Sequence, residues 1–316
     1  MAKPIVLLDI PLAPFLEEML EPHCETSPWS WLQEGHEALA EVQGIYTYGH
    51  ATVNGALMDR LPALRVISNF GVGVDHIDVT AAAARNIPVG NTPGVLDGAT
   101  ADLTMALILG AARNVVVGDN FARGPDFTSY DPSHLLGAEV FGSTLGIIGL
   151  GRIGWQVAKR ASGFDMRILY HNRRRNLDAE KALGVKYASL EETLAESHFV
   201  TLNVPLTADT TGLISENQLR RMRPDAILIN VSRGAVVDHA ALHRALTEKW
   251  IAGAALDVTD PEPLPRNHPL LRLPNLVLTP HLGSATWRTR RRMGEMAAAN
   301  LIAGLRGVPL PNQVRC

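Results

Sequence analysis

The sequence predicts an α/β protein that contains two parallel β-sheets. Short apolar, β-rich runs alternate with helical stretches over roughly the first 90 residues, and the same alternation begins again at Thr144. This order is typical of βαβ units, in which helices join successive parallel strands. With 316 residues, of which 46% are hydrophobic, the chain is long enough for about two domains.

The first part of the chain supplies four predicted strands and three helical stretches. The strands are expected at residues 5–9, 44–48, 65–70 and 87–91. Helices are expected between them, at 16–20, 54–61 and 79–86. Because strands and helices alternate, this part is predicted to form the first parallel sheet.

A long helical segment near 98–118, followed by the Gly/Pro/Asp-rich stretch GPDFTSYDPSHLLG at 124–137, forms the expected junction between the two domains. The most apolar run covers 103–117 and is interrupted by Arg113 and Asn114. It is shorter than a membrane span, so we predict a buried helix there.

The second part of the chain repeats the alternation and ends in a helix. Its predicted strands are at 144–150, 166–170, 198–204, 226–231, 251–258 and 275–280. Each strand but the last precedes an amphipathic helical stretch. The final helical pattern, 285–305, could pack on either domain.

Composition excludes several classes of partner. The net charge of −3 gives no overall attraction for nucleic acid or for an anionic membrane. Cys24 and Cys316 cannot form a disulfide framework, show no metal-ligand spacing, and fit a reducing compartment. The first residues lack the layout of a signal peptide. We therefore expect a cytoplasmic protein without a metal site.

The motif GLGRIG, residues 149–154, predicts a dinucleotide site. It lies between an apolar strand and a helix, where glycines permit a tight turn, close approach of a pyrophosphate, and close helix–strand packing. The N–H groups at the helix start then face the phosphates. The expected cofactor contacts are Gly149, Gly151, Arg152, Ile153 and Gly154.

The end of the second strand of this unit predicts which dinucleotide binds. An NAD site carries Asp or Glu at this position, whereas a 2′-phosphate requires arginine. Here the sequence is LYHNRRR, so Asn172, Arg173 and Arg174 are candidate ligands of a 2′-phosphate. A solvated basic turn is the alternative, and it suits Arg175 best. The sequence favours NADP(H) over NAD(H).

Three chemically active side chains follow three successive strands. Arg233 follows the strand AILINV, Glu262 follows IAGAALDV, and His281 follows NLVLTP. Ligands bind outside the carboxyl ends of parallel strands, so these residues are expected to converge there. Arginine can hold a 2-oxo acid, histidine can deliver a proton, and a carboxylate can orient the histidine. Each alone could be structural; together they predict an acid–base site.

At these residues the chain resembles the D-2-hydroxyacid dehydrogenase family, and most closely its glyoxylate/hydroxypyruvate reductase branch. The resemblance covers nearly the whole chain and is carried by blocks in family order. These blocks are NFGVGVDHID, NTPGVLDGATADL, GIIGLGRIG, NVPLTADTTGLI, INVSRGAVVD, ALDVTDPEP and TPHLGSAT.

The resemblance implies a nucleotide domain, residues 98–286, inserted into a flavodoxin-like substrate domain of residues 1–97 and 287–316. It implies that Arg233, Glu262 and His281 are catalytic, with His281 as proton donor, and that Arg233 and His281 also contact substrate. The backbone amides of Val72 and Gly73 would hold the substrate carboxylate. The remaining cofactor contacts would be Pro205, Thr210, Val231, Asp257 (at the nicotinamide carboxamide) and Gly283.

The family also implies a homodimer formed through the nucleotide domain. The chain departs from the branch at Phe127 and Tyr130, where tryptophans are frequent, and at Trp287, where histidine is common. Tyr130 is expected to reach the substrate pocket of a partner subunit. Tyr48 is a further pocket candidate, although a half-buried strand residue is its simpler interpretation.

The expected activity is NADPH-dependent reduction of glyoxylate and hydroxypyruvate to glycolate and D-glycerate. One alternative is a 2-ketogluconate reductase, which needs a roomier pocket. Another is a corepressor-like protein that binds dinucleotide to assemble. Such corepressors usually carry a disordered tail, and this sequence has none beyond Cys316.

Overall fold

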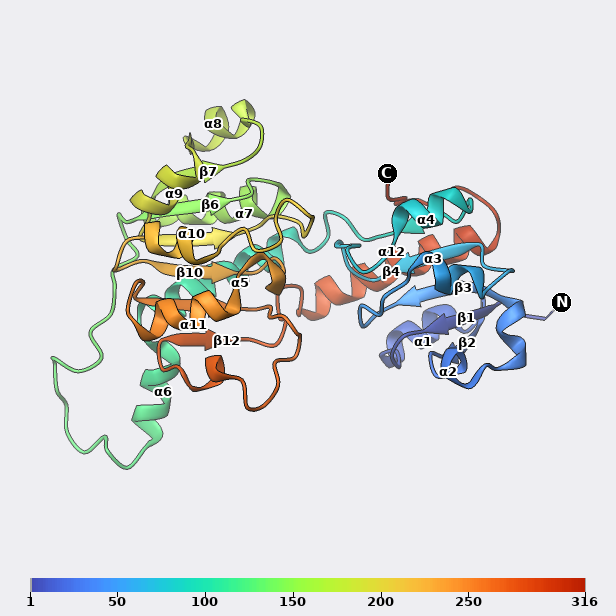
Figure 1. Cartoon of the computed structure of the whole chain (residues 1–316), viewed down its shortest axis with the longest axis horizontal. Helices are drawn as coiled ribbons and strands as arrows, with labels where there is room; N and C mark the ends of the chain where they lie inside the picture. Colours follow the sequence, from blue (N-terminus) through green and yellow to red (C-terminus); the bar gives the residue numbers. More distant parts are fainter. Residues whose placement is uncertain (1, 316) are drawn as a thin grey trace. The chain divides into compact units, whose positions relative to one another are not determined.

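The computed structural model describes residues 2–315, so Cys316 lies outside the described residues. The chain divides into two units: residues up to Leu96 together with those from Thr286 onward, and the continuous segment Asp97–Ala285. Each unit contains one sheet, and every strand pair in both sheets is parallel. The predicted fold class, α/β with two Rossmann-like parallel sheets, is confirmed (Figure 1).

The first unit has a five-stranded sheet in the order β2-β1-β3-β4-β5. The strands are β1 (Ile5–Leu8), β2 (Glu25–Pro28), β3 (Val42–Thr47), β4 (Val66–Asn69) and β5 (Val89–Gly90). The helices are α1 (Pro14–Leu20), α2 (Trp31–Glu34), η1 (Glu37–Glu41), α3 (Gly55–Asp59), α4 (Val79–Ala84) and α12 (Trp287–Leu305). Strand β2 was not predicted, because its residues ETSP contain no apolar run and only Ser27 is buried.

The final helix, α12, packs on the first unit, where it contacts β3, β4 and α1. Thr286 caps its start by accepting a hydrogen bond from the Thr289 N–H. Ser68 of β4 donates to the Ala297 carbonyl at 2.8 Å, which ties the helix to the sheet. The chain end that follows the second unit therefore returns to complete the first.

The second unit has a seven-stranded sheet in the order β12-β11-β10-β9-β6-β7-β8. The strands are β6 (Thr144–Ile148), β7 (Arg167–His171), β8 (Lys186–Tyr187), β9 (Phe199–Leu202), β10 (Ile227–Asn230), β11 (Gly253–Leu256) and β12 (Leu276–Leu278). The chain runs outward from β6 in one direction and from β9 in the other, so the strand order reverses between them. In doubly wound sheets, ligands bind at such a reversal.

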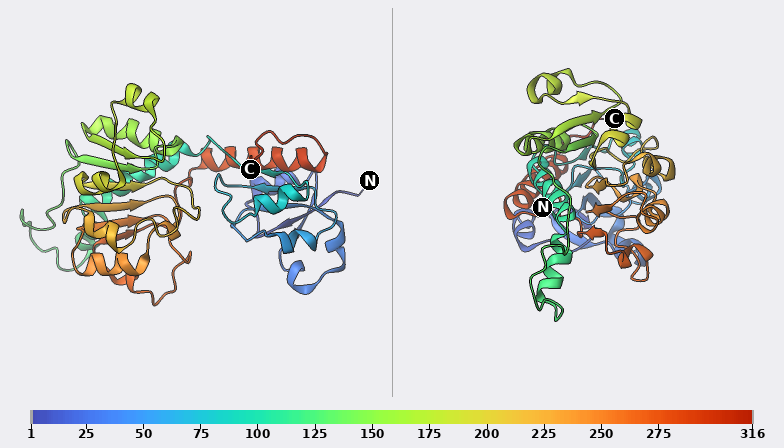
Figure 2. Two further views of the ribbon diagram at one scale, coloured as in Figure 1. Left: turned by 45° about the horizontal axis from the view of Figure 1, so that its top comes forward. Right: turned by 90° about the vertical axis from the view of Figure 1, so that its left-hand side faces the viewer.

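Two layers of helices and short 3₁₀ turns accompany this sheet (Figure 2). The elements are α5 (Asp97–Ala112), α6 (Val115–Arg123), α7 (Arg152–Ala161), η2 (Ser162–Phe164), α8 (Leu177–Leu183), α9 (Leu190–Glu196), α10 (Glu216–Arg221), η3 (Gly234–Val236), α11 (His239–Thr247) and η4 (Pro269–Arg272). Buried strand residues separate two apolar clusters, one with α5 and α7 and one with α10 and α11. Strand β8 was not predicted, because a strand of two residues is too short to show a repeating pattern of apolar side chains.

The prediction of one buried helix near 98–118 was wrong in part. Helix α5 is buried along one side, but the chain bends by 59° before α6 because Asn114 adopts a left-handed conformation, with φ of +51°. In α6, Val115 and Val116 are exposed. Figure 1 shows α6 and the following loop, residues 124–143, extending away from the sheet of this unit. We call residues 115–143 the arm.

Among the described residues, no single helix is long and apolar enough to cross a membrane. Within residues 2–315, one pair of helices, α5 and α6, reaches that length and composition when taken together, but it is bent by 59°.

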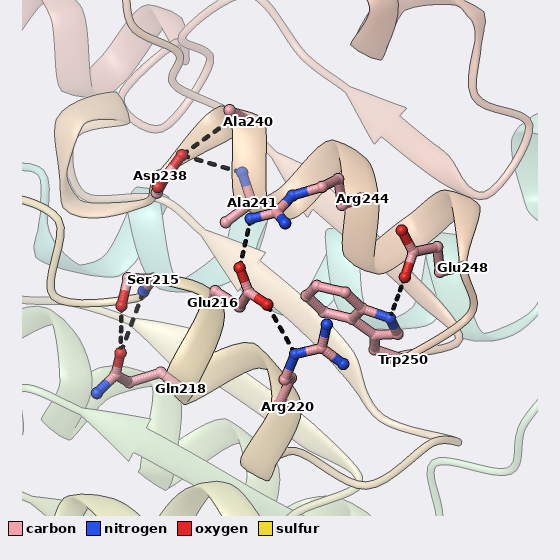
Figure 3. A network of polar contacts seen from close by, with 10 residues as sticks. All are labelled: Ser215, Glu216, Gln218, Arg220, Asp238, Ala240, Ala241, Arg244, Glu248 and Trp250. Carbon is pink, nitrogen blue, oxygen red and sulfur yellow. Dashed lines mark hydrogen bonds and ion pairs between the residues drawn. The ribbon is translucent and has the colours of Figure 1, made fainter.

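A network of charged side chains joins α10 to α11 (Figure 3). Glu216 accepts hydrogen bonds from Arg220 of its own helix and from Arg244 of the next. The guanidinium of Arg220 also stacks 3.5 Å from the ring centroid of Trp250. These contacts hold the pKa of Glu216 below its usual value, chiefly through the hydrogen bond from Arg220. They join α10, which precedes β10 in the chain, to α11, which follows it.

Candidate active site

The candidate site residues of the second unit lie at one edge of its sheet. All its strands are parallel, so their carboxyl ends meet at the same edge. The candidates that follow successive strands are Gly149 after β6, Asn172 after β7, Pro205 after β9, Val231 and Arg233 after β10, Asp257 and Glu262 after β11, and His281 and Gly283 after β12.

The turn after β6 requires glycine. Gly149 has a φ of +99°, and a Cβ there would lie 2.7 Å from the backbone carbon and oxygen of Asn203. Its N–H donates to the His171 carbonyl at 2.9 Å. The turn therefore sits directly at the reversal between β6 and β9.

The next residues form an anion-binding helix start. Gly151 is the N-cap of α7, and no atom lies within 4 Å of the position a Cβ would take there. The N–H groups of the first helical turn have no partner in a preceding turn, and the helix dipole is positive at this end. These groups belong to Arg152, Ile153 and Gly154. The open space and the donors fit a pyrophosphate group.

The end of β7 carries three exposed arginines, one of which is paired with a glutamate of the next helix. Arg175 donates two hydrogen bonds to Glu180, at 2.9 and 2.6 Å. Arg173 is 85% exposed and lies 3.8 Å from Asp209, and Arg174 is also exposed. The hydrogen bonds from Arg175 and from the Tyr170 hydroxyl lower the pKa of Glu180 to about 2.

Asn172 contacts the glycine turn. Its Oδ1 accepts a hydrogen bond from the Leu150 N–H at 2.7 Å, and its Nδ2 lies 3.4 Å from the Leu150 carbonyl. The side chain thus ties the end of β7 to the glycine turn. The amide has a second proton, and its expected contact with a phosphate or ribose hydroxyl stays a prediction.

The loop after β9 is closed by its own hydrogen bonds. The Thr210 hydroxyl donates to the Pro205 carbonyl at 2.6 Å and accepts from the Thr207 N–H at 2.8 Å. Asp209, the residue near Arg173, belongs to the same loop. Pro205 and Thr210 therefore lie in a defined turn beside the arginine-bearing end of β7.

His281 and Glu262 are in direct contact. The Nδ1 atom of His281 lies 2.6 Å from Oε1 of Glu262, and the side chains are 31% and 39% exposed. The other oxygen, Oε2, accepts a long hydrogen bond from the Thr259 N–H at 3.3 Å. The carboxylate thus fixes the plane of the imidazole ring, while both groups stay accessible at the sheet edge.

Buried Asp257 shapes the turn that carries His281. It is only 2% exposed, and its carboxylate accepts hydrogen bonds from the Thr279 hydroxyl at 2.6 Å, the Leu282 N–H at 2.7 Å and the Gly283 N–H at 2.8 Å. The His281 N–H donates to the Asp257 carbonyl at 2.9 Å. These bonds hold His281 in a left-handed conformation, with φ of +56°.

The loop that carries Arg233 is held in two ways. Buried Asn230 donates from Nδ2 to the Arg233 carbonyl at 2.8 Å, and its Oδ1 accepts from the Ser232 N–H at 3.0 Å. A Cβ on Gly234 would lie 2.0 Å from the backbone carbon of Thr259, so only glycine allows these two loops to meet. The Arg233 loop therefore packs directly on the loop that leads to Glu262.

Asn230 and His239 are two supporting residues that sequence reasoning missed. His239, at the start of α11, has its Nδ1 3.0 Å from the Asp260 carbonyl in the Glu262 loop. Burial lowers the pKa of His239, so its neutral form is favoured. A polar residue at the end of an apolar strand, as in ILIN, was the available signal for Asn230.

The other predicted site residues lie elsewhere. Val72 and Gly73 belong to the first unit, in the turn after β4. The Tyr48 ring packs edge-on against Phe70, with centroids 4.7 Å apart. The three aromatic residues at which the chain departs from the reductase branch are strongly exposed. They are Phe127 and Tyr130 in the arm, and Trp287 at the start of α12.

No group of three or more His, Cys, Asp or Glu side chains among residues 2–315 is arranged to hold a metal ion.

Comparison with known proteins identifies the family. The model of the D-isomer specific 2-hydroxyacid dehydrogenase NAD-binding domain matches residues 105–283. A glyoxylate reductase of Korarchaeum cryptofilum is 52% identical over 83% of this chain and 79% of its own. One of Aeropyrum pernix is 45% identical over 99% of this chain and 96% of its own.

A solved structure gives the same result. The NADPH-dependent glyoxylate/hydroxypyruvate reductase of Sinorhizobium meliloti, in complex with NADP and malonate, has a TM-score of 0.90 and 34% identity, and the match covers 99% of this chain and 97% of the other. The chain therefore belongs to the D-isomer specific 2-hydroxyacid dehydrogenase family and carries the family's nicotinamide-dinucleotide-binding domain.

Proposed function

We propose that this protein reduces small 2-oxo acids, glyoxylate and hydroxypyruvate, to glycolate and D-glycerate with NADPH. The observation that carries the proposal is the 2.6 Å contact between His281 and Glu262, at the sheet edge where the Arg233 loop also packs. The relatives named glyoxylate reductase support the choice of substrate.

His281 is the proton donor in this proposal. The nicotinamide supplies the hydride when bound, so the protein has to hold the substrate and protonate the developing alkoxide. With Nδ1 directed at Glu262, Nε2 is the ring nitrogen that delivers the proton. Histidine is suited to this because it exchanges protons near neutral pH.

Arg233 holds the substrate. Its planar guanidinium can bind a carboxylate oxygen and the 2-oxo oxygen together, which orients the carbonyl for reduction. The N–H groups of Val72 and Gly73, in the first unit, are further proposed contacts of a substrate carboxylate. Asn230 and Gly234 set the path of the loop that carries Arg233.

NADPH is the proposed cofactor because the end of β7 carries no carboxylate in the position that serves NAD. Arg173 and Arg174 are exposed there and can bind a 2′-phosphate, whereas Arg175 is already engaged by Glu180. Arginine suits this ligand because its fork binds phosphate oxygens in pairs.

A homodimer in the cytoplasm is the proposed state of the protein. The arm extends from the nucleotide-binding unit and exposes several large apolar side chains, a pattern that marks interaction surfaces. These are Val115, Val116, Phe127, Tyr130, Leu136 and Phe141. Val116→Asp should convert the dimer to monomer in light scattering; a wild-type protein that is already monomeric contradicts the proposal. The cytoplasmic location rests on the sparse cysteines.

The direct test is the initial rate of NADPH and, separately, NADH oxidation with glyoxylate, hydroxypyruvate, pyruvate and 2-ketogluconate. Faster reduction of the first two substrates with NADPH supports the proposal. Preference for 2-ketogluconate indicates the ketoaldonate reductase alternative. Tight NADPH binding without turnover of any substrate indicates a binding protein instead.

A further inference from the structure

We infer that Asn69 and Asn91 are positioning residues that aim the backbone amides of Val72 and Gly73 at a substrate carboxylate. This inference deepens the proposed function and rests on it. Neither asparagine is expected to touch the substrate; both act through the turn between them.

In the turn after β4, the carbonyl groups of Gly71, Val72 and Gly73 all accept hydrogen bonds from asparagine side chains. The Asn69 side chain donates from Nδ2 to the Gly71 carbonyl at 2.9 Å and to the Gly73 carbonyl at 2.8 Å. The Asn91 side chain donates to the Val72 carbonyl between them at 2.8 Å. Three consecutive carbonyls are therefore fixed by two side-chain amides.

Asn69 is itself fixed. It is fully buried, and its Oδ1 accepts a hydrogen bond from the Thr47 hydroxyl at 2.8 Å, on the adjacent strand β3. Both protons of its amide group then serve the turn. A buried amide whose two N–H groups and oxygen are all hydrogen-bonded has one orientation, so Asn69 holds the turn rigidly to the sheet.

Asn91 is anchored by residues near the C-terminus. Its backbone carbonyl accepts from Nδ2 of Asn300 in α12 at 2.9 Å, and its N–H donates to the Asn312 carbonyl at 3.1 Å. Asn300 is fully buried and accepts from the Asn312 N–H at 2.9 Å. The C-terminal part of the chain therefore sets the position of the amide that holds Val72.

The direction of the amides follows from the peptide geometry. In a planar trans peptide, the carbonyl of one residue and the N–H of the next point in opposite directions. Holding the Gly71 carbonyl toward Asn69 turns the Val72 N–H away from Asn69. Holding the Val72 carbonyl toward Asn91 turns the Gly73 N–H away from Asn91. Among residues 2–315, neither N–H donates a hydrogen bond to a protein acceptor.

Successive backbone N–H groups in a turn can together bind an anion. A carboxylate with two oxygens can accept from both groups, and hydrogen bonds to a charged acceptor are stronger than neutral ones. A turn that could rotate would lose this alignment. The asparagines therefore contribute to binding of the carboxylate and not to transfer of the proton or the hydride.

The test compares Asn69→Ser and Asn91→Ser with wild type, because serine is too short to reach the carbonyls. Asn275→Ser is the matched control: the Asn275 amide also donates to two carbonyls, of Leu246 and Ala252, both at 3.2 Å, but before β12 in the second unit. Each protein is assayed for KM and kcat with glyoxylate, inhibition by oxalate, and the Kd of NADPH.

Each serine variant should raise KM for glyoxylate and Ki for oxalate by about tenfold or more, since a lost hydrogen bond to a charged group costs about that factor. The value of kcat should change much less, and the Kd of NADPH should not change. The control should match wild type in all four quantities. A general loss of structure would instead lower kcat and NADPH binding together.

Folded variants with an unchanged Ki for oxalate overturn the inference. If Asn69→Ser does not fold, the less buried Asn91→Ser decides the question alone. Wild-type protein that binds NADPH but neither reduces glyoxylate nor binds oxalate would overturn the proposed function together with the inference. Wild-type turnover with unaffected variants would remove only the inference.

Discussion

The Nδ1 atom of His281 lies 2.6 Å from Oε1 of Glu262, although the two residues are 19 positions apart and follow different strands. Strands β11 and β12 are parallel neighbours, so the residues after them emerge at the same edge. The side chain of Asp257 holds the turn of His281, and the Arg233 loop packs against the loop of Glu262. The pair therefore lies where the loops after three neighbouring strands meet.

Replacing the proposed proton donor should slow the chemical step. His281→Ala should reduce kcat by about 10²-fold to 10⁴-fold, the usual range for general acid–base help. The Kd of NADPH should stay near the wild-type value, because His281 is not one of the predicted dinucleotide contacts. Stopped-flow and steady-state rates with glyoxylate measure the first quantity and fluorescence titration the second. Near wild-type turnover would falsify the assignment of His281.

Removing the charge of Glu262 while keeping its shape should also reduce kcat. A glutamine can present N–H to Nδ1 of His281, which favours the wrong arrangement of ring protons, so a loss of about 10-fold to 10³-fold is expected. Glu191→Gln, at an exposed position of α9, is the control and should leave kcat unchanged. If both variants behave like wild type, the pair has only a structural role.

The exposed arginines should decide which dinucleotide is preferred. Replacing Arg173 and Arg174 with alanine should raise KM for NADPH by about tenfold or more, since each charge-assisted contact with a 2′-phosphate is lost, and should change KM for NADH little. Arg175→Ala is the matched control, because Arg175 is paired with Glu180. Equal changes for both dinucleotides would contradict the 2′-phosphate assignment.

The pair of Glu180 and Arg175 should make stability depend on pH. The pKa of Glu180 falls from 4.5 to about 2 on folding. Because the folded pKa is depressed, its stabilising contribution is complete above pH 4.5 and is lost as pH falls toward 2. Glu180→Gln should thus lower the urea midpoint at pH 7 and approach wild type at acid pH. Glu139→Gln, which is exposed in the same unit, should not show this convergence; a constant difference at every pH would speak against the linkage.

The alternation of apolar runs was sufficient to predict both sheets, because buried parallel strands need continuous apolar residues. It missed β2 and β8, which lie at sheet edges and are short or polar. It also predicted one helix where α5 and α6 are separate, because the spacing of apolar residues does not show that Asn114 leaves the helical conformation. The site residues stay predictions, but their location at strand ends followed from the order of strands alone.

The sequence by itself determined the two parallel sheets, the glycine turn after β6, and the placement of Arg233, Glu262 and His281 after consecutive strands. These features depend on local patterns and on the rule that parallel strands share one carboxyl edge. Only the tertiary structure decided which polar groups pair. Asn172 binds the glycine turn, Asp257 holds the turn of His281, and Asn69 and Asn91 hold the turn of Val72. Such pairings depend on directions and distances between residues far apart in the chain, and a linear pattern does not contain them.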